Sequence, residues 1–151
     1  MTDHPMIVRQ RAVEACLDRF NGQRLDYKRY DCVRLARFLF NQSGHSTVTI
    51  LKGKRWGTRA GAEAAMRASG LSCLSQGVDA LGFARIPPAS AIIGDLVALP
   101  VDGEAALFGC ALTVNVGNGR LLAAVPIPGE DNALRFAVIR PAQFKTAWRL
   151  I

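Results

Sequence analysis

The chain has 151 residues, of which 50% are hydrophobic and 21% are charged, so it is long enough and apolar enough to bury a core. We predict a single domain over residues 1–151, helical at about 6–82 and strand-forming at about 83–151. Residues 1–5 are polar and no apolar run follows them, which predicts a protein made in the cytoplasm, without a signal peptide or membrane span. The four cysteines form no CxxC pair and there are only two histidines, so we expect no metal, no cofactor and no disulfide framework.

The positive charge of the chain is concentrated in its first part. The net charge is +7, with 12 Lys/Arg against 5 Asp/Glu in residues 1–60 and 7 against 7 in residues 61–151. Such an excess predicts contact with an acidic protein, an anionic polymer or nucleic acid, and the lack of a nucleic-acid motif argues against the last. The candidate interaction face consists of Lys52, Lys54, Arg55, Trp56 and Arg59.

The first half of the sequence shows helical periodicity. Apolar residues recur at steps of four in residues 6–20, which predicts an amphipathic helix ended by Asn21 and Gly22. Asp31 is a good N-cap for a second, largely buried helix that begins with Cys32 and is closed by Gly44. A third helix follows the cap residue Thr58 and stops at Gly70, and residues 73–81 predict a further short helix.

From residue 83 onward the pattern changes to short strands. Prolines make residues 86–88 extended, and residues 117–119 predict a tight hairpin turn. Helices followed by an antiparallel meander define an α+β fold, with N-terminal helices packed on a C-terminal antiparallel sheet. The predicted strands are 94–100, 107–116, 120–125, 134–140 and an edge strand at 146–150.

Cys32 is the residue type best placed to carry chemistry. At the start of a helix the dipole stabilises a thiolate and lowers the pKa of a cysteine, and Arg29 is close enough in sequence to add to this. The competing interpretation is a small apolar residue that only packs the helix N-terminus. A catalytic cysteine also needs a base within hydrogen-bond reach and a third group to orient that base.

Three motifs in order carry a family resemblance: residues 30–35 (YDCVRL), residues 94–97 (GDLV) and residues 116–121 (VGNGRL). This layout resembles the NlpC-type, papain-like cysteine peptidases of bacterial cell walls. The resemblance implies that Asp31 and Cys32 open the central helix with the nucleophile, that the Gly-Asp pair begins the first core strand, and that the next strand starts with the catalytic histidine.

A second set of motifs is similar to a branch of unknown-function domains encoded in phage tail gene clusters. They are residues 56–62 (WGTRAGA), residues 80–83 (ALGF) before 86–88 (IPP), and residues 147–150 (AWRL). That branch lacks the catalytic histidine, and its gene context implies a part in tail structure or assembly.

The resemblance fails at the catalytic positions themselves. Aligned through the hairpin turn, the histidine position falls near Ala111 and the third polar position near Ala123, and neither residue is a base. His45 lies 13 residues beyond Cys32, about 19 Å along a helix, and His4 would need an unusual fold-back. Coupled catalytic residues fail together when one is removed, which predicts an inactive site.

Three hypotheses follow. The first is a phage or prophage tail component, near the tail tip, that uses a degenerate peptidase-like fold to contact other tail proteins and resides in the host cytoplasm before it joins the virion. The second is an active cysteine peptidase or amidase acting on cell-wall peptide through Cys32, with His4 or a partner chain as base. The third is a binder of nucleic acid or another anionic polymer through residues 52–59.

Overall fold

The computed structural model describes residues 3–141 and 143–151 as four α-helices and a six-stranded antiparallel sheet. The helices come first in the chain and the strands follow, so the fold is α+β. Among the described helices, none has both the length and the apolar character needed to cross a bilayer. The helices are α1 (Pro5–Phe20), α2 (Cys32–Gln42), α3 (Arg59–Ala68) and α4 (Leu74–Asp79).

Local capping signals fix the helix ends. The Asp31 side chain accepts a hydrogen bond from the Arg34 backbone N–H at 2.9 Å, and the Thr58 hydroxyl accepts one from the Gly61 N–H at 3.0 Å. Gly22, with φ of 86°, follows the end of α1 in the left-handed conformation that glycine adopts at low cost. All four predicted helices are therefore confirmed, with ends shifted by at most a few residues.

The strands form a sheet in the order β1-β6-β2-β3-β4-β5. Strands β2 to β5 make the predicted antiparallel meander. The predicted edge strand at 146–150 is wrong in position, because β6 pairs with β1 on one side and with β2 on the other. The strands are β1 (Ala84–Ile86), β2 (Leu96–Leu99), β3 (Ala111–Gly117), β4 (Arg120–Pro126), β5 (Leu134–Ile139) and β6 (Thr146–Arg149).

The strand predicted at 107–116 begins later than its apolar composition suggests. A 3-10 helix, η2 (Gly103–Phe108), occupies its first residues, and a second, η1 (Pro88–Ser90), follows β1. Gly109 then reverses the chain with φ of 79°, and a Cβ atom at this position would lie 2.4 Å from Cβ of Cys73. The close approach of Cys73 and the left-handed backbone together set the start of β3 at Ala111.

The turn between β3 and β4 is the one predicted from sequence. Asn118 and Gly119 both have positive φ, at 56° and 71°, as the two central residues of a tight hairpin turn require. The register shifts between Asn115 and Gly117, which marks a bulge just before this turn.

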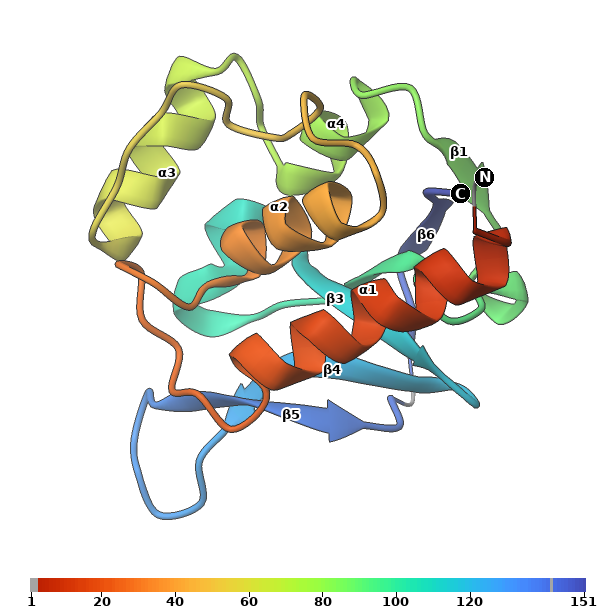
Figure 1. The fold of residues 1–151 in the computed structure, drawn as a ribbon. Helices are drawn as coiled ribbons and strands as arrows, with labels where there is room; N and C mark the ends of the chain where they lie inside the picture. The colour runs from red at the N-terminus through yellow and green to blue at the C-terminus, as the bar shows by residue number, and fades with distance from the viewer. Residues whose placement is uncertain (1–2, 142) are drawn as a thin grey trace.

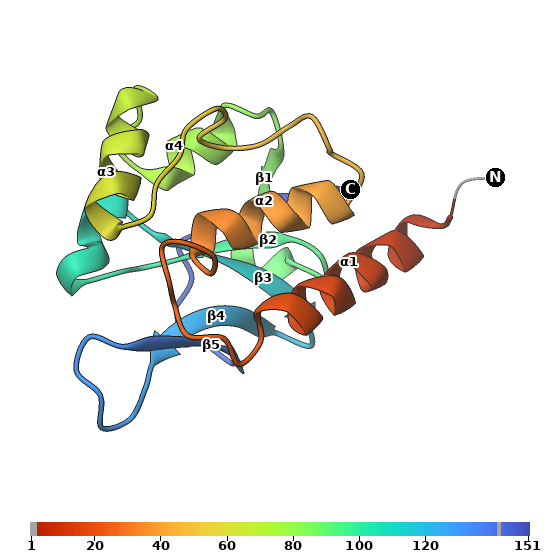
Figure 2. The same cartoon turned by 60° about the vertical axis from the view of Figure 1, so that its left-hand side comes forward.

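The helices cover one face of the sheet, with α1 and α2 lying across β3 and β4 (Figures 1 and 2). A continuous cluster of buried apolar side chains on this face joins α1 and α2 to the strands, from Ala12 to Leu150. The opposite face carries a much smaller cluster, formed by Val97, Leu121 and Ala147. Since successive strand residues alternate between faces, these two clusters assign each strand side chain to the helix side or the far side.

Candidate functional site

The N-terminus of α2 is built around a buried carboxylate. Asp31 has 2% of its surface exposed and is the N-cap of the helix. One carboxylate oxygen accepts from the Arg34 backbone, and the other accepts from the Trp56 indole N–H at 3.0 Å and pairs with the Arg34 guanidinium. Asp31 is thus occupied in holding the helix start to the segment that contains Trp56, and three donors compete for its oxygens.

Two arginines of α2 enclose the Trp56 ring. The guanidinium carbons of Arg34 and Arg37 lie 4.6 and 4.8 Å from the ring centre. Arg34 also donates to the Trp56 carbonyl at 3.0 Å, and Arg37 donates to the Ile50 carbonyl at 2.9 Å. The polar stripe of α2 therefore anchors residues 50–56 instead of facing open solvent.

Cys32 is the first residue of α2 and is half-buried. The pKa of its thiol is raised from 9.0 to about 12, mainly by burial; a backbone hydrogen bond from Leu112 opposes this rise, and the nearby Asp31 carboxylate and Cys110 thiol add to it. The expected lowering of this pKa by the helix start and Arg29 is not found. A thiol with this pKa is protonated at neutral pH, and the protonated form is a poor nucleophile.

The two degenerate positions, Ala111 and Ala123, lie on the face of the sheet away from Cys32. Leu112 belongs to the helix-side cluster, so its neighbour Ala111 points to the far side. Leu121 belongs to the far-side cluster, so Ala123, two residues on, points the same way. The residues that act on the Cys32 thiol are instead those on either side of Ala111, namely Cys110 just before β3 and Leu112 on β3, and neither is a base.

A cleft of about 510 Å³ lies where β3 and β4 separate. The pairs between these strands begin at Val114, and the cleft is lined by Ala111 on one strand and by Ala123 on the other. Tyr27 also lines the cleft and stacks on Phe108, with ring centres 6.3 Å apart. Burial, followed by the nearby Cys32 thiol and then Asp31, raises the pKa of Tyr27 to about 12. The cleft therefore brings a tyrosine close to Cys32, but this hydroxyl stays protonated at neutral pH.

Both histidines are committed elsewhere. His45 follows the C-terminal end of α2, where its Nε2 lies 2.6 Å from the Leu150 carbonyl oxygen and its ring contacts Phe83. His4 is the N-cap of α1, and its Nδ1 accepts from the Met6 N–H at 3.1 Å. Because α2 is 11 residues long, about 16 Å, His45 lies beyond hydrogen-bond reach of Cys32 at its opposite end.

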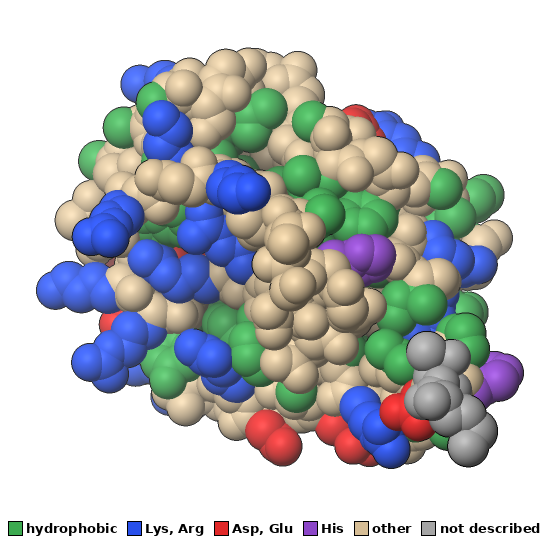
Figure 3. Space-filling model, turned by 45° about the horizontal axis from the view of Figure 1, so that its top comes forward, with side chains coloured by type: hydrophobic (Ala, Val, Ile, Leu, Met, Phe, Trp, Pro, Cys, Tyr) green, Lys and Arg blue, Asp and Glu red, His purple; other side chains and the backbone are tan. Residues whose placement is uncertain are grey.

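The candidate interaction face is only partly exposed. Lys52, Lys54 and Arg55 are exposed, and Figure 3 shows Lys and Arg side chains gathered on one side of the molecule. Arg59 lies 3.6 Å from the Glu63 carboxylate. Trp56 contributes little surface to this face, because the residue is 9% exposed and its ring is held between two arginines of α2.

Sequence reasoning missed a buried ion-pair network that joins the two ends of the chain. Asp95, fully buried before β2, lies 2.9 Å from the Arg9 guanidinium and 3.1 Å from that of Arg149, and it accepts from the Ile92 N–H at 2.8 Å. A signal was present, since Arg9 falls on the apolar face of α1 with Ala12. The Gly-Asp motif therefore has a structural role at the beginning of β2.

Among the side chains that the structure describes, no three His, Cys, Asp or Glu gather in a way that could hold a metal ion. Cys16, Cys32, Cys73 and Cys110 are all free thiols. The site combines a helix-initial cysteine with a raised pKa, a cleft between β3 and β4, and a network of arginine contacts around Trp56.

Fold and site together define an α+β protein in which a helix-initial cysteine packs against an antiparallel sheet, with both histidines of the chain held elsewhere. The chain belongs to the DUF6950 family, described as a domain of unknown function, whose family model matches residues 7–150. Comparison with curated proteins gave no match, and comparison with solved structures gave none either.

Proposed function

We propose that this protein is a structural or assembly component of a phage or prophage tail, near the tail tip, built on an NlpC-type, papain-like fold that has lost its catalytic function. The order of the motifs at residues 30–35, 94–97 and 116–121 supports the fold assignment. The tail assignment rests on the similarity of residues 56–62, 80–83 and 147–150 to domains from tail gene clusters. In this proposal the protein resides in the host cytoplasm during assembly and then in the virion, where it contacts other tail proteins.

One feature supports a loss of catalysis: burial of the Cys32 thiol raises its pKa and so favours the protonated form. Its pKa of about 12 leaves roughly one thiolate in 10⁵ molecules at pH 7. Neither His4 nor His45 lies where it could accept the thiol proton, since each already has a partner in its own part of the fold. A cysteine peptidase without that proton transfer loses the cooperative contribution of its catalytic residues.

The test has a biochemical arm and a particle arm. Purified protein incubated with bacterial peptidoglycan is expected to release no peptide, and the Cys32→Ala variant is expected to behave identically. Tagged protein expressed with the surrounding tail genes is expected to co-sediment with assembled tails. Recovery of the protein only as a free monomer, absent from the particles, would overturn the proposal.

A peptidase or amidase whose base comes from a partner chain is the second candidate. The observation in its favour is the cleft of about 510 Å³ between β3 and β4, which is large enough for a peptide segment and is lined by Tyr27, a neighbour of Cys32. Under this hypothesis, adding the partner would produce peptidoglycan cleavage that Cys32→Ala abolishes. Unchanged cleavage by the variant would assign the activity to the partner alone.

A further inference from the structure

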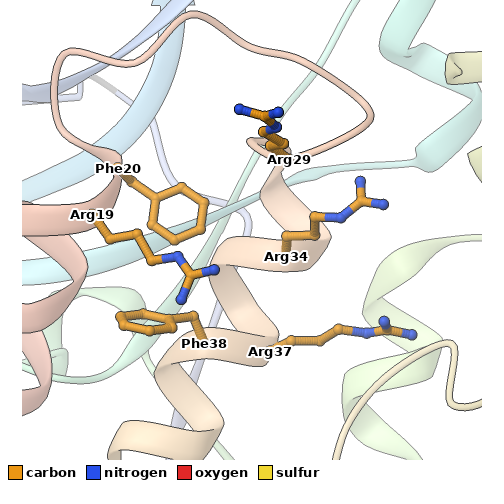
Figure 4. A pocket seen from close by; sticks show the side chains of 6 residues that line it. All are labelled: Arg19, Phe20, Arg29, Arg34, Arg37 and Phe38. Carbon is orange, nitrogen blue, oxygen red and sulfur yellow. The ribbon is translucent and has the colours of Figure 1, made fainter. Parts of the chain in front are cut away.

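A second concavity, of about 270 Å³, lies on the outer side of α2, away from the Cys32 thiol. Figure 4 shows its composition: the end of α1 contributes one wall, the outward side of α2 another, and the loop before α2 closes it from above. Four of its six lining residues are arginines and the other two are phenylalanines: Arg19, Phe20, Arg29, Arg34, Arg37 and Phe38. We refer to these six residues as the arginine pocket.

The arginines of the pocket divide into two kinds. Arg34 and Arg37 extend to the same side in Figure 4, and their contacts with the Trp56 ring hold them, so they supply charge from fixed positions. Arg19 extends between Phe20 and Phe38, with its guanidinium carbon 4.8 Å from the centre of the Phe38 ring. Within the described part of the chain, neither Arg19 nor Arg29 forms an ion pair, so their guanidinium groups remain free to bind an anion.

The positive charges of the pocket are only partly balanced by acids, since Asp31 pairs with Arg34 and its charge also acts to raise the pKa of Arg37. Asp31 is the one carboxylate paired with a pocket arginine among the described residues, and it is turned inward to the helix start. Burial, followed by the charge of Arg34, lowers the pKa of Arg37. An anion entering the pocket would relieve this repulsion, and planar guanidinium groups bind carboxylates through paired hydrogen bonds.

The size and the aromatic rings of the pocket decide which anion fits. At about 270 Å³ it falls just below the usual range of sites for whole small molecules or cofactors, and it exceeds what a bare inorganic ion fills. A Glu or Asp side chain with its adjoining main chain matches this space. Single-stranded nucleic acid needs open aromatic faces for base stacking, but Phe20 is 1% exposed and one face of Phe38 is covered by Arg19.

We propose that the arginine pocket binds the carboxylates of an acidic segment of a partner protein. This inference deepens the proposed function and rests on it for the identity of the partner, because it gives the chemistry by which a tail protein would be recognised. The exposed Lys52, Lys54 and Arg55 belong to the segment that Arg34 and Arg37 hold at Trp56 and Ile50, so they extend the positive potential beside the pocket and would guide an acidic segment toward it.

The experiment measures fluorescence anisotropy of a fluorescein-labelled hexaglutamate peptide with the full-length protein, at low and physiological salt. Wild type is expected to bind hexaglutamate and not hexaglutamine, more tightly at low salt. The double variant Arg19→Gln/Arg29→Gln is expected to weaken binding about tenfold, since two partly exposed ion pairs are removed. The single variant Arg29→Glu, at an exposed residue, is a second measurement that does not disturb Arg19 on the Phe38 ring.

The matched control removes the same charge elsewhere. The control variant is Arg120→Gln/Arg140→Gln. Arg120 is the first residue of β4 and Arg140 follows β5, both residues are exposed, and the variant is expected to keep binding within about twofold. Equal losses of affinity in both double variants, or no binding of hexaglutamate by wild type, would overturn the proposal that the arginine pocket binds carboxylates. Tighter binding of oligothymidylate than of hexaglutamate, or competition by inorganic phosphate as strong as by free hexaglutamate, would also contradict a carboxylate-bearing peptide partner.

This outcome is separable from that of the tail assignment. Peptide binding that depends on Arg19 and Arg29, in a protein absent from tail particles, would keep the pocket and reject the tail function. If the protein binds no peptide, and if Arg19→Gln/Arg29→Gln does not affect its incorporation into tails, the tail function is kept and the arginine pocket is rejected as a binding site.

Discussion

At the scale of single residues, two opposed effects act on the pKa of the Cys32 thiol. The helix start and the hydrogen bond from the Leu112 backbone favour the thiolate, whereas burial favours the neutral thiol. Burial is the larger effect, because the sulfur faces the core between the helix and β3, where it exchanges water for apolar neighbours. A position that would activate an exposed cysteine therefore leaves this one unreactive.

Alkylation tests this conclusion. In the folded protein at pH 7 we expect iodoacetamide to modify Cys32 about 10³-fold more slowly than in the chain unfolded in guanidinium, given a pKa of about 12 instead of 9.0. Peptide mapping by mass spectrometry over time gives both rates for the same cysteine. Complete modification of Cys32 in the folded protein within the time needed for the unfolded control would restore it as a candidate nucleophile.

Asp95 makes a second prediction at this scale. Replacing Asp95 by Asn leaves the guanidinium of Arg9, which is almost fully buried, without its countercharge, so we expect a loss of about 3–5 kcal/mol in the free energy of unfolding. Asp3→Asn removes an exposed pair with Arg11 and is expected to cost less than about 1 kcal/mol. Urea unfolding of the two variants measures the difference, and equal small losses would show that the Asp95 network contributes little.

At the scale of elements, β6 was expected to be an edge strand but lies inside the sheet. Its four residues pair on both sides, so β6 joins β1 to the rest of the sheet. Trp148 on this strand is fully buried, and its indole N–H donates to the Asp79 carboxylate at 2.9 Å. An apparently terminal strand is therefore part of the interior.

Two aromatic substitutions test whether β6 is an internal strand of the sheet. Trp148→Ala is expected to lower the free energy of unfolding by about 3–5 kcal/mol, because it leaves a large cavity in the core. Phe144→Ala, two residues before the strand and 38% exposed, is expected to change it by no more than about 0.5 kcal/mol. Thermal or urea unfolding distinguishes them, and a small loss for Trp148→Ala would contradict the central position of β6.

At the scale of the whole molecule, the buried thiols make stability depend on alkaline pH. The pKa values of Cys16 and Cys32 are about 12 in the folded protein, both raised mainly by burial, against 9.0 for a free thiol. Between these values the folded chain binds protons that the unfolded chain has lost. The stabilisation from these raised pKa values is therefore complete below about pH 9 and declines as pH rises toward 12.

We expect the free energy of unfolding to fall by about 1.4 kcal/mol per pH unit for each such thiol above pH 9, with Cys16, which has no exposed surface, as the clearer case. Urea unfolding in reducing buffer from pH 8 to 10.5 gives the slope. Cys16→Ala should flatten it by one thiol's share, whatever the variant costs at neutral pH. Parallel slopes for the variant and wild type would show that Cys16 titrates normally in the folded state.

The sequence by itself determined the features that depend on neighbours in the chain. Asp31 and Thr58 cap helices through hydrogen bonds that reach three residues ahead, and the turn at Asn118 needs only the backbone freedom of two adjacent residues. The helix and strand order, and hence the α+β class, followed from such local signals. The sequence also identified a cysteine at the start of a helix, and it showed that the aligned catalytic positions, Ala111 and Ala123, hold no base.

Only the tertiary structure decided what residues far apart in the chain do to one another. Trp56 joins Asp31 across 25 positions and Arg9 joins Asp95 across 86, so neither burial could be read from local pattern. The same holds for β6, whose place between β1 and β2 depends on pairing with distant strands, and for Cys32, whose pKa is set by the sheet packed against it. Desolvation and strand pairing come from the three-dimensional neighbours of a residue, whereas capping and turn formation come from its neighbours along the chain.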